Sequence, residues 1–143
     1  MLQDFFPYRL AITAAAFSRQ LTDVYQRQFG LSRDEWRLLY LLASVAGETS
    51  LDLGRKTSLD KVQVSRAAER LRAKGLIIRA TSAQDGRLWL YSCSAEGRAL
   101  FSQVHDLVEA KSNAMLDGLS AEDRAALERG LSALHAATRL AGK

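Results

Sequence analysis

Residues 60–77, DKVQVSRAAERLRAKGLI, carry side chains that can hydrogen-bond to base edges and phosphates, set at the spacing of a helix. Arg66 is suited to guanine, Gln63 to adenine and Val62 to the methyl group of thymine. Ser65 and the helix N-terminus are suited to a phosphate. The opposite face is apolar at helical spacing: Val64, Ala67, Ala68 and Leu71. The segment therefore predicts a helix with a buried inner face and a DNA-reading outer face. The residues predicted to contact DNA from it are Lys61, Val62, Gln63, Ser65, Arg66 and Arg70.

Positive charge is concentrated in the same part of the chain. The 143 residues have a net charge of +4. Residues 50–90 hold nine basic and four acidic residues, a net charge of +5, so the rest of the chain has a net charge of −1. A basic middle between near-neutral flanks favours contact with a polyanion. The alternative is a chance cluster of solvated lysine and arginine.

A short helix over about 50–57 is expected before the reading helix, joined to it by the three-residue turn SLD. Asp60 can cap the second helix, with Gln63 in a box-like arrangement. Gly75 is placed to end that helix at about Lys74. Gly54 lies where the two helices would cross, which allows close packing. The pair reads as a helix-turn-helix, although two core helices with a solvated basic face remain an alternative.

Two short runs rich in β-branched and aromatic residues follow, LIIRA and LWLYSC, separated by TSAQDGR. They predict an antiparallel hairpin with a long polar tip. An arginine at the tip can enter the narrow minor groove of A·T-rich DNA, and Asp85 can pair with an arginine to hold the tip's shape. A plain surface turn is the alternative. The residues predicted to contact DNA from this wing are Asp85, Gly86 and Arg87.

Longer helices are expected on both sides of this lobe. One runs over about 8–28, with Pro7 at its first position and Gly30 after its end. Another runs from a capping box of Ser32 and Glu35 to about Val45. Two more are expected over about 94–117, with Ser94 as the cap, and 121–140. The expected fold class is therefore mainly α with a small β-hairpin wing, a winged helix-turn-helix with flanking dimerisation helices.

From about Leu31 to Leu100 the chain resembles the MarR family of bacterial transcription regulators. The matching stretches are LSRDEWRLLYLLA, SLDKVQVSRAAERLRAKGLIIR and DGRLWLYSCSAEGRAL. The family typically has a D-x-R wing with Arg in the middle, then a strand ending Leu-Thr and a Gly three residues later. Here the wing is Asp85-Gly86-Arg87, and the strand ends Cys93-Ser94 before Gly97. Gly86 thus removes one phosphate-directed charge.

The resemblance implies a homodimer in which the helices over about 8–28 and 94–140 form the dimerisation platform and about 31–92 forms the DNA-binding lobe, within a single domain of residues 1–143. The apolar stripes of the last two helices agree with this, because little else in the chain can cover them. Intrachain packing of these stripes is the alternative.

The resemblance also implies a small aromatic or phenolic effector between the dimerisation helices and the DNA-binding lobe. Arg9 or Arg37 is the candidate partner for a carboxylate group of the effector. Aromatic residues at helical spacing are, however, more commonly plain core. The residues predicted to line the pocket are Tyr8, Arg9, Phe17, Trp36 and Tyr40.

Other classes of function find no support in the sequence. A single cysteine, Cys93, excludes an intrachain disulfide, and it is expected to be a buried, inert thiol. No metal spacing, cofactor motif, nucleophile–base pair or phosphate loop is found, so we expect no enzyme, metal or cofactor. No signal peptide or apolar run of spanning length is found, so a cytoplasmic location without membrane contact is expected.

Two hypotheses remain. The first is a homodimeric DNA-binding transcription regulator, a ligand-responsive repressor of a palindromic operator on double-stranded DNA. The second is a winged-helix protein-interaction module without specific DNA binding, for which Gly86 is the main support.

Overall fold

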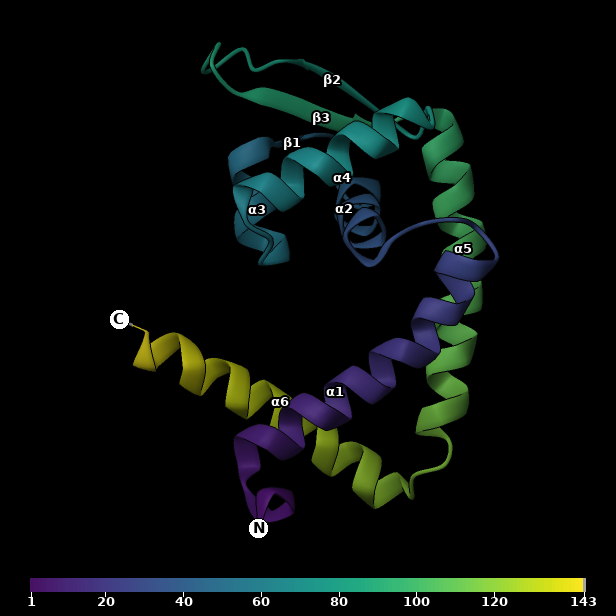
Figure 1. Cartoon of the computed structure of the whole chain (residues 1–143), viewed down its shortest axis with the longest axis vertical. Helices are drawn as coiled ribbons and strands as arrows, with labels where there is room; N and C mark the ends of the chain where they lie inside the picture. The colour runs from purple at the N-terminus through teal and green to yellow at the C-terminus, as the bar shows by residue number, and fades with distance from the viewer. Residues whose placement is uncertain (143) are drawn as a thin grey trace. The chain divides into compact units, whose positions relative to one another are not determined.

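The structure is a computed structural model and describes residues 1–142. Its elements follow one another along the chain as Figure 1 shows. They are η1 (Leu2–Asp4), α1 (Phe6–Thr22), η2 (Asp23–Arg27), α2 (Arg33–Ala43), β1 (Glu48–Thr49), α3 (Ser50–Thr57), α4 (Lys61–Ala73), β2 (Ile77–Thr81), β3 (Trp89–Cys93), α5 (Ala95–Leu116) and α6 (Ala121–Ala141). The predicted fold class, mainly α with a small β-hairpin wing, is confirmed.

The chain divides into two compact units, Met1–Val108 and Glu109–Lys143. The first contains the predicted helix-turn-helix and wing, and α5 passes from it into the second. Among the described residues, no helix is both long and apolar enough to cross a membrane. The single domain predicted for residues 1–143 stays a prediction.

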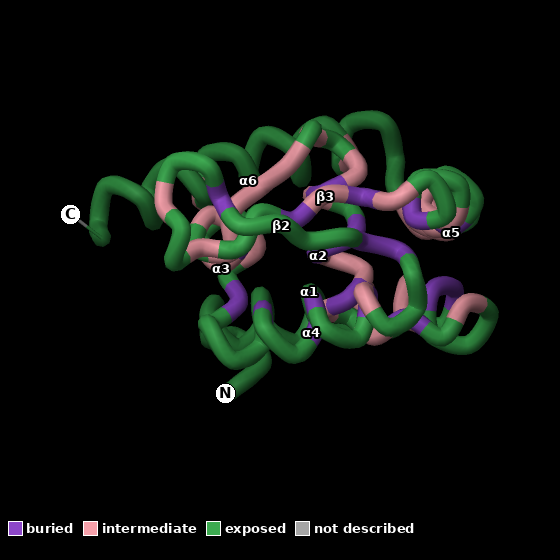
Figure 2. The backbone as a smooth tube through the Cα atoms, turned by 90° about the horizontal axis from the view of Figure 1, so that it is seen from above, coloured by how far each residue is buried: buried purple, intermediate pink, exposed green. Residues whose placement is uncertain are grey.

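The core of the first unit lies where α2 meets α3 and α4. Leu38, Leu42, Leu53 and Leu71 are completely buried there. Val104 of α5 is buried in the same cluster, so α5 is anchored to this core through its first half. Figure 2 shows the buried stretches gathered in this part of the chain. This core holds α4 by one face and leaves the other face to solvent.

A three-stranded antiparallel sheet forms the wing, with strand order β1-β3-β2. The predicted hairpin is confirmed, with Ile77 opposite Cys93 and Thr81 opposite Trp89. The short strand β1, in which Glu48 pairs with Tyr91, was not predicted from the sequence. A strand of two residues has no readable alternation, so its pattern could not be recognised.

Several predicted helix ends differ from the structure. The first helix begins at Phe6, so Pro7 is its second residue, and its last turn is the π-helix η2 rather than regular α-helix to residue 28. The second ends at Ala43 instead of Val45. Ser44 ends it because both its amide and its hydroxyl donate to the carbonyl of Leu41. The predicted turn glycines hold, since Gly30 and Gly75 both adopt positive φ.

The predicted capping box of α2 is only half formed. The Ser32 hydroxyl accepts the amide of Glu35, as expected. The Glu35 carboxylate instead accepts a 2.5 Å hydrogen bond from Lys74 Nζ. A long-range ion pair thus replaces the local bond, because Glu35 is buried, at 3% exposure, where a charged partner is needed.

Candidate nucleic-acid interface

Helix α4 presents two chemically different faces. Its inner face, Val64, Ala67, Ala68 and Leu71, is buried in the core as predicted. The residues predicted to contact DNA are all exposed: Lys61, Val62, Gln63, Ser65, Arg66 and Arg70. Val62 is 56% exposed. The outer face therefore combines cations, hydroxyl and amide groups and one apolar contact.

The start of α4 is fixed by a complete capping box. Asp60 Oδ1 accepts the amide of Gln63 at 2.8 Å, and Gln63 Oε1 accepts the amide of Asp60 at 2.9 Å. This confirms the predicted cap and changes the expectation for Gln63. Bidentate pairing with adenine needs both the oxygen and the nitrogen of the side-chain amide. In this structure the oxygen is already engaged by the cap, so Gln63 offers chiefly its N–H donors.

The turn between α3 and α4 is tight. Ser58 adopts a left-handed conformation, with φ of 61°, and Leu59 is buried in the core. A Cβ atom on Gly54 would lie 3.3 Å from the Leu59 carbonyl oxygen and 3.8 Å from a methyl group of Val64. The missing side chain at Gly54 thus lets α3 approach the turn and α4, as expected from the sequence. The two helices form the predicted helix-turn-helix.

The wing tip is held by Asp85. Its Oδ1 accepts the backbone amide of Arg87 at 3.0 Å and the guanidinium Nε at 3.2 Å. The backbone bond from Arg87, and then the side-chain bond, hold the pKa of the Asp85 carboxyl below its ordinary value. The Arg87 side chain is nevertheless 91% exposed. The tip therefore presents a guanidinium on a fixed loop, and Gly86 beside it is exposed as well.

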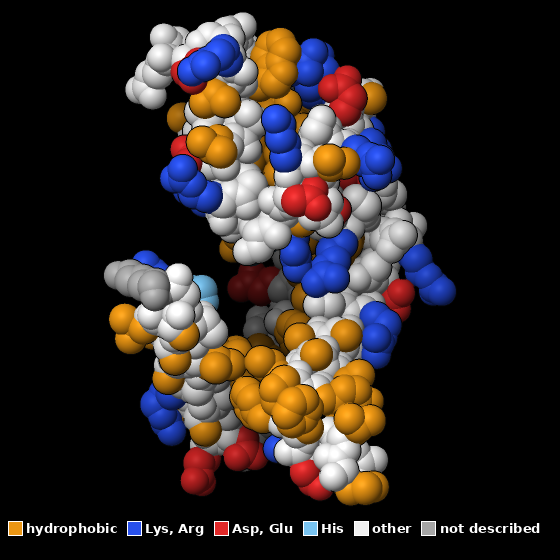
Figure 3. Space-filling model, turned by 60° about the vertical axis from the view of Figure 1, so that its left-hand side comes forward, with side chains coloured by type: hydrophobic (Ala, Val, Ile, Leu, Met, Phe, Trp, Pro, Cys, Tyr) orange, Lys and Arg blue, Asp and Glu red, His pale blue; other side chains and the backbone are white. Residues whose placement is uncertain are grey.

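A hollow of about 630 Å³, the wing hollow, lies between α3, α4 and the wing. Arg79 bridges it by placing its guanidinium 4.0 Å from the ring of Trp89 and 3.6 Å from the carboxylate of Glu69 on α4. Figure 3 shows Lys and Arg side chains over this end of the unit. The basic residues that line the wing hollow are Arg55, Lys61, Arg79 and Arg87. The positive charge and the concave shape of the wing hollow suit the phosphate backbone of a nucleic acid.

A second hollow of about 450 Å³, the aromatic hollow, lies between α1, η2, α2 and α3. Trp36 and Tyr40 line it, as the pocket prediction requires, and so does Arg37. The other predicted pocket residues, Tyr8, Arg9 and Phe17, lie outside it on α1. The full lining is Ser18, Leu21, Tyr25, Arg33, Trp36, Arg37, Tyr40, Leu41, Lys56 and Thr57.

Several residues of the aromatic hollow were not predicted from the sequence, among them Tyr25, Lys56 and Thr57. Tyr25 and Trp36 are stacked with centroids 5.8 Å apart, and Phe101 of α5 stacks on Trp36 at 5.6 Å. Lys56 and Thr57 come from the last turn of α3. Nothing in their local sequence distinguishes them from a solvated helix end, so their role in the hollow depends on the tertiary fold.

Cys93 lies outside both hollows and is buried, as expected. Burial raises the pKa of its thiol, and the nearby Arg98 opposes the rise. A buried thiol with a raised pKa is a poor nucleophile at neutral pH.

Comparison with known proteins supports this description. Residues 29–88 match the model of the MarR family. The HTH-type transcriptional regulator YdgJ of Bacillus subtilis strain 168 is 30% identical over 95 residues, which are 66% of this chain and 58% of that relative. The match therefore spans little more than half of the relative's length.

Solved structures share the fold over most of the chain. The MepR–DNA complex of S. aureus superimposes with a TM-score of 0.81 at 19% identity, covering 92% of this chain and 97% of that one. Bordetella bronchiseptica BpsR, whose DNA binding is regulated by 6-hydroxynicotinic acid, gives a TM-score of 0.74 at 22% identity, covering 87% of this chain and 91% of that one. At these identities the likeness shows a common fold.

Proposed function

We propose that this chain, whose residues 29–88 match the model of the MarR family, is a sequence-specific, DNA-binding transcription regulator of that family. One observation carries the proposal. Helix α4 buries its apolar face completely and leaves Lys61, Ser65 and Arg66 exposed on the other. A helix held in this way can enter the major groove, where its side chains meet base edges.

The wing supplies the second contact in this proposal. Arg87 reaches the minor groove from the tip, while Asp85 orients it. The common fold with MepR, which was solved bound to DNA, supports this mode of binding.

We further propose a homodimer that represses from a palindromic operator. Helix α1 has no buried residue, and Phe5, Phe6, Leu10 and Ile12 are exposed at or near its start. Helix α6 also has no buried residue and exposes Leu127 and Leu131. Apolar surface of this extent favours a protein partner, and a second copy would bring two reading helices to one two-fold site.

We propose that the protein is cytoplasmic. We also propose that the aromatic hollow is the effector site. Stacked aromatic rings beside Arg33, Arg37 and Lys56 suit a small aromatic anion. The regulation of BpsR by 6-hydroxynicotinic acid supports an effector of this class. Tyr8, Arg9 and Phe17, which were predicted for the pocket, lie on α1 outside the aromatic hollow and are not part of the proposed effector site.

Fluorescence anisotropy tests the proposal. The protein is titrated onto labelled DNA from upstream of its own coding region, across a salt series, beside Arg66→Ala and Arg87→Ala. Each variant is expected to lose about 1–3 kcal/mol of binding free energy, and Arg66→Ala is expected to relax the sequence preference as well. Lys111→Ala on α5 is the control, because it removes one cation outside the interface.

Two other results would contradict the proposal. Weak binding that salt abolishes, and that neither substitution changes, would leave a basic surface without specific readout. The winged-helix interaction module would then account better for the exposed face of α4. Light scattering checks the dimer separately, since a monomer at micromolar concentration would remove the basis for a palindrome.

A further inference from the structure

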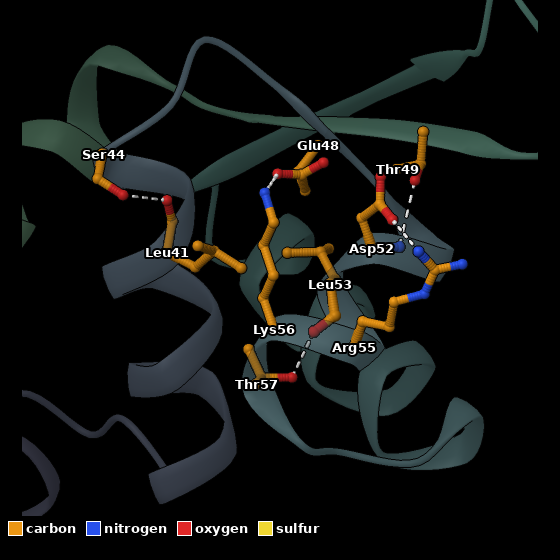
Figure 4. Close-up of polar contacts among 9 residues, drawn as sticks. All are labelled: Leu41, Ser44, Glu48, Thr49, Asp52, Leu53, Arg55, Lys56 and Thr57. Carbon is orange, nitrogen blue, oxygen red and sulfur yellow. Dashed lines mark hydrogen bonds and ion pairs between the residues drawn. The ribbon is translucent and has the colours of Figure 1, made fainter. Parts of the chain in front are cut away.

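Lys56 belongs to the aromatic hollow and is also part of the frame of the DNA-binding lobe. Its Nζ donates a 2.6 Å hydrogen bond to Glu48 Oε2. Figure 4 shows the side chain running from α3 to the Glu48 carboxylate. This hydrogen bond, with the charge of Glu48, raises the pKa of Lys56, so the side chain is an ammonium at neutral pH. An ammonium group has three N–H donors, of which the Glu48 bond uses one.

The two ends of this ion pair differ in exposure. The Lys56 side chain is 50% exposed, whereas the Glu48 side chain is only 11% exposed. Lys56 can therefore reach water or a ligand in the hollow, whereas Glu48 stays largely shielded from water, so the cost of breaking the pair falls on Glu48. A carboxylate left nearly buried without its cation is unfavourable. Any anion that draws Lys56 away thus changes the free energy of the element that holds Glu48.

That element is β1, which connects directly to the wing. Glu48 pairs with Tyr91 and Thr49 with Leu90 of β3, one of the two wing strands. Lys56 itself lies in the last turn of α3, two residues before Ser58 begins the turn into α4. The one ion pair therefore joins the hollow to the wing and to the helix-turn-helix. Arg33 and Arg37 also line the hollow, from α2, but Glu48 pairs with Lys56 and with neither of them.

We propose that Lys56 couples an anionic effector in the aromatic hollow to DNA binding, by exchanging Glu48 for the carboxylate of a one-ring aromatic acid. The inference rests on the proposed function. The aromatic ring stacks against Tyr25, Trp36 or Tyr40, and the carboxylate takes the Lys56 ammonium. Glu48 then lacks its ion pair, and the packing of β1 on β3 and the end of α3 adjust. DNA binding weakens because the wing and α4 no longer hold the arrangement that fits DNA.

The probe is 4-hydroxybenzoate, with neutral 4-hydroxybenzamide as its control of the same shape. Calorimetry gives the affinity of the DNA-free protein for each compound. Anisotropy gives the affinity for operator DNA with and without saturating compound, and the ratio of the two DNA affinities measures the coupling. For the parent protein we expect a ratio of about ten or more with the acid and about one with the amide.

Four variants separate binding of the acid from coupling. Lys56→Met should weaken acid binding roughly tenfold and bring the ratio close to one. Lys56→Arg should keep the coupling, since the cation is retained. Glu48→Gln should bind the acid more tightly, because the competing carboxylate is gone, yet also show a ratio near one. Arg33→Met, which lines the same hollow without contacting Glu48, should weaken acid binding and keep the parent's ratio. Thermal melts check that each variant folds.

The outcomes distinguish the inference from the function beneath it. If the parent binds its operator but does not bind 4-hydroxybenzoate up to about 10 mM, the inference is wrong and the proposed function stands. The same holds if Lys56→Met and Glu48→Gln keep the parent's ratio. If the parent itself does not bind DNA specifically, the proposed function is wrong, and this inference is wrong with it.

Discussion

Lys74 of the α4 C-cap lies 2.5 Å from the buried carboxylate of Glu35 on α2, and the same ammonium donates to the carbonyl of Gly30 at 2.8 Å. This ion pair between residues far apart in sequence thus attaches the C-terminal end of α4 to α2. The orientation of α4 depends on this contact as well as on its apolar face.

Replacing Lys74 by Met should therefore destabilise the fold. The substitution leaves Glu35, which is 3% exposed, without its cation. We expect a loss of about 2 kcal/mol in the free energy of unfolding, measured by urea titration, because the pair is buried on one side only. Lys61→Met, on the exposed start of α4, should change stability by less than about 0.5 kcal/mol. The double variant with Glu35→Gln should recover part of the loss; a full additive loss would contradict the pairing.

Gly97 should not tolerate alanine. A Cβ atom there would lie 2.0 Å from the Leu76 carbonyl oxygen and 3.3 Å from the sulfur of Cys93. The Leu76 carbonyl is backbone and cannot easily move away, so Gly97→Ala should cost about 3 kcal/mol or more in unfolding free energy. Gly130→Ala in α6 is the matched control, with no atom within 4 Å of its Cβ. It should raise stability by up to about 1 kcal/mol. Equal effects of the two substitutions would contradict this account.

The sequence predicts the local parts of this fold well. Turn glycines, the Asp60 cap and the apolar face of α4 depend on neighbours within one or two turns, so their patterns are readable. Glu35 shows the limit. Its position three residues after Ser32 indicates a capping box, but a lysine 39 residues away takes its carboxylate instead.

The candidate site divides in the same way. The DNA-facing residues follow from helical spacing and hairpin position, which are local. The aromatic hollow combines side chains from four elements, so Lys56 and Tyr25 could not be assigned to it without the tertiary fold. β1 was missed for a related reason, since a two-residue strand is defined by its partner Tyr91 and not by its own pattern.

The order of the wing tip should depend on pH through Asp85. The bonds from Arg87 hold the pKa of this carboxyl below its ordinary value of 3.8. Because the pKa is lowered on folding, the stabilisation of the tip is fully present above the ordinary pKa. It is lost as the pH falls through the lowered pKa. A carbon-13 NMR titration of the Asp85 carboxyl should therefore give a pKa below 3.8. Arg87→Ala should move it part of the way back, and an unchanged value would contradict the pairing.

The fluorescence emission of Trp89 should depend on the contacts by which Arg79 connects the wing to α4. The Arg79 guanidinium lies over the Trp89 ring and beside Glu69. Arg79→Ala removes both contacts, so the emission of Trp89, recorded in a Trp36→Phe background, should shift to longer wavelength as water reaches the ring. Arg72→Ala, which pairs with the same Glu69 but does not contact Trp89, is the control. A shift of equal size in both variants would mean that Glu69, and not the cation over the ring, sets the environment of Trp89.

Gly86 stands at the wing position where the MarR family, which this chain resembles, usually has arginine, and the structure does not require glycine there. Its φ lies outside the left-handed region, and a Cβ atom would meet a Thr81 methyl group at 3.9 Å, an ordinary contact. Gly86→Arg should therefore fold normally and add a phosphate-directed charge beside Arg87. We expect operator affinity to rise about tenfold at low salt, with the salt dependence steeper by about one released counterion. Gly86→Gln controls for side-chain size and should leave the salt dependence unchanged. If Gly86→Arg alters neither quantity, the tip does not approach DNA, and the interface proposed here is confined to α4.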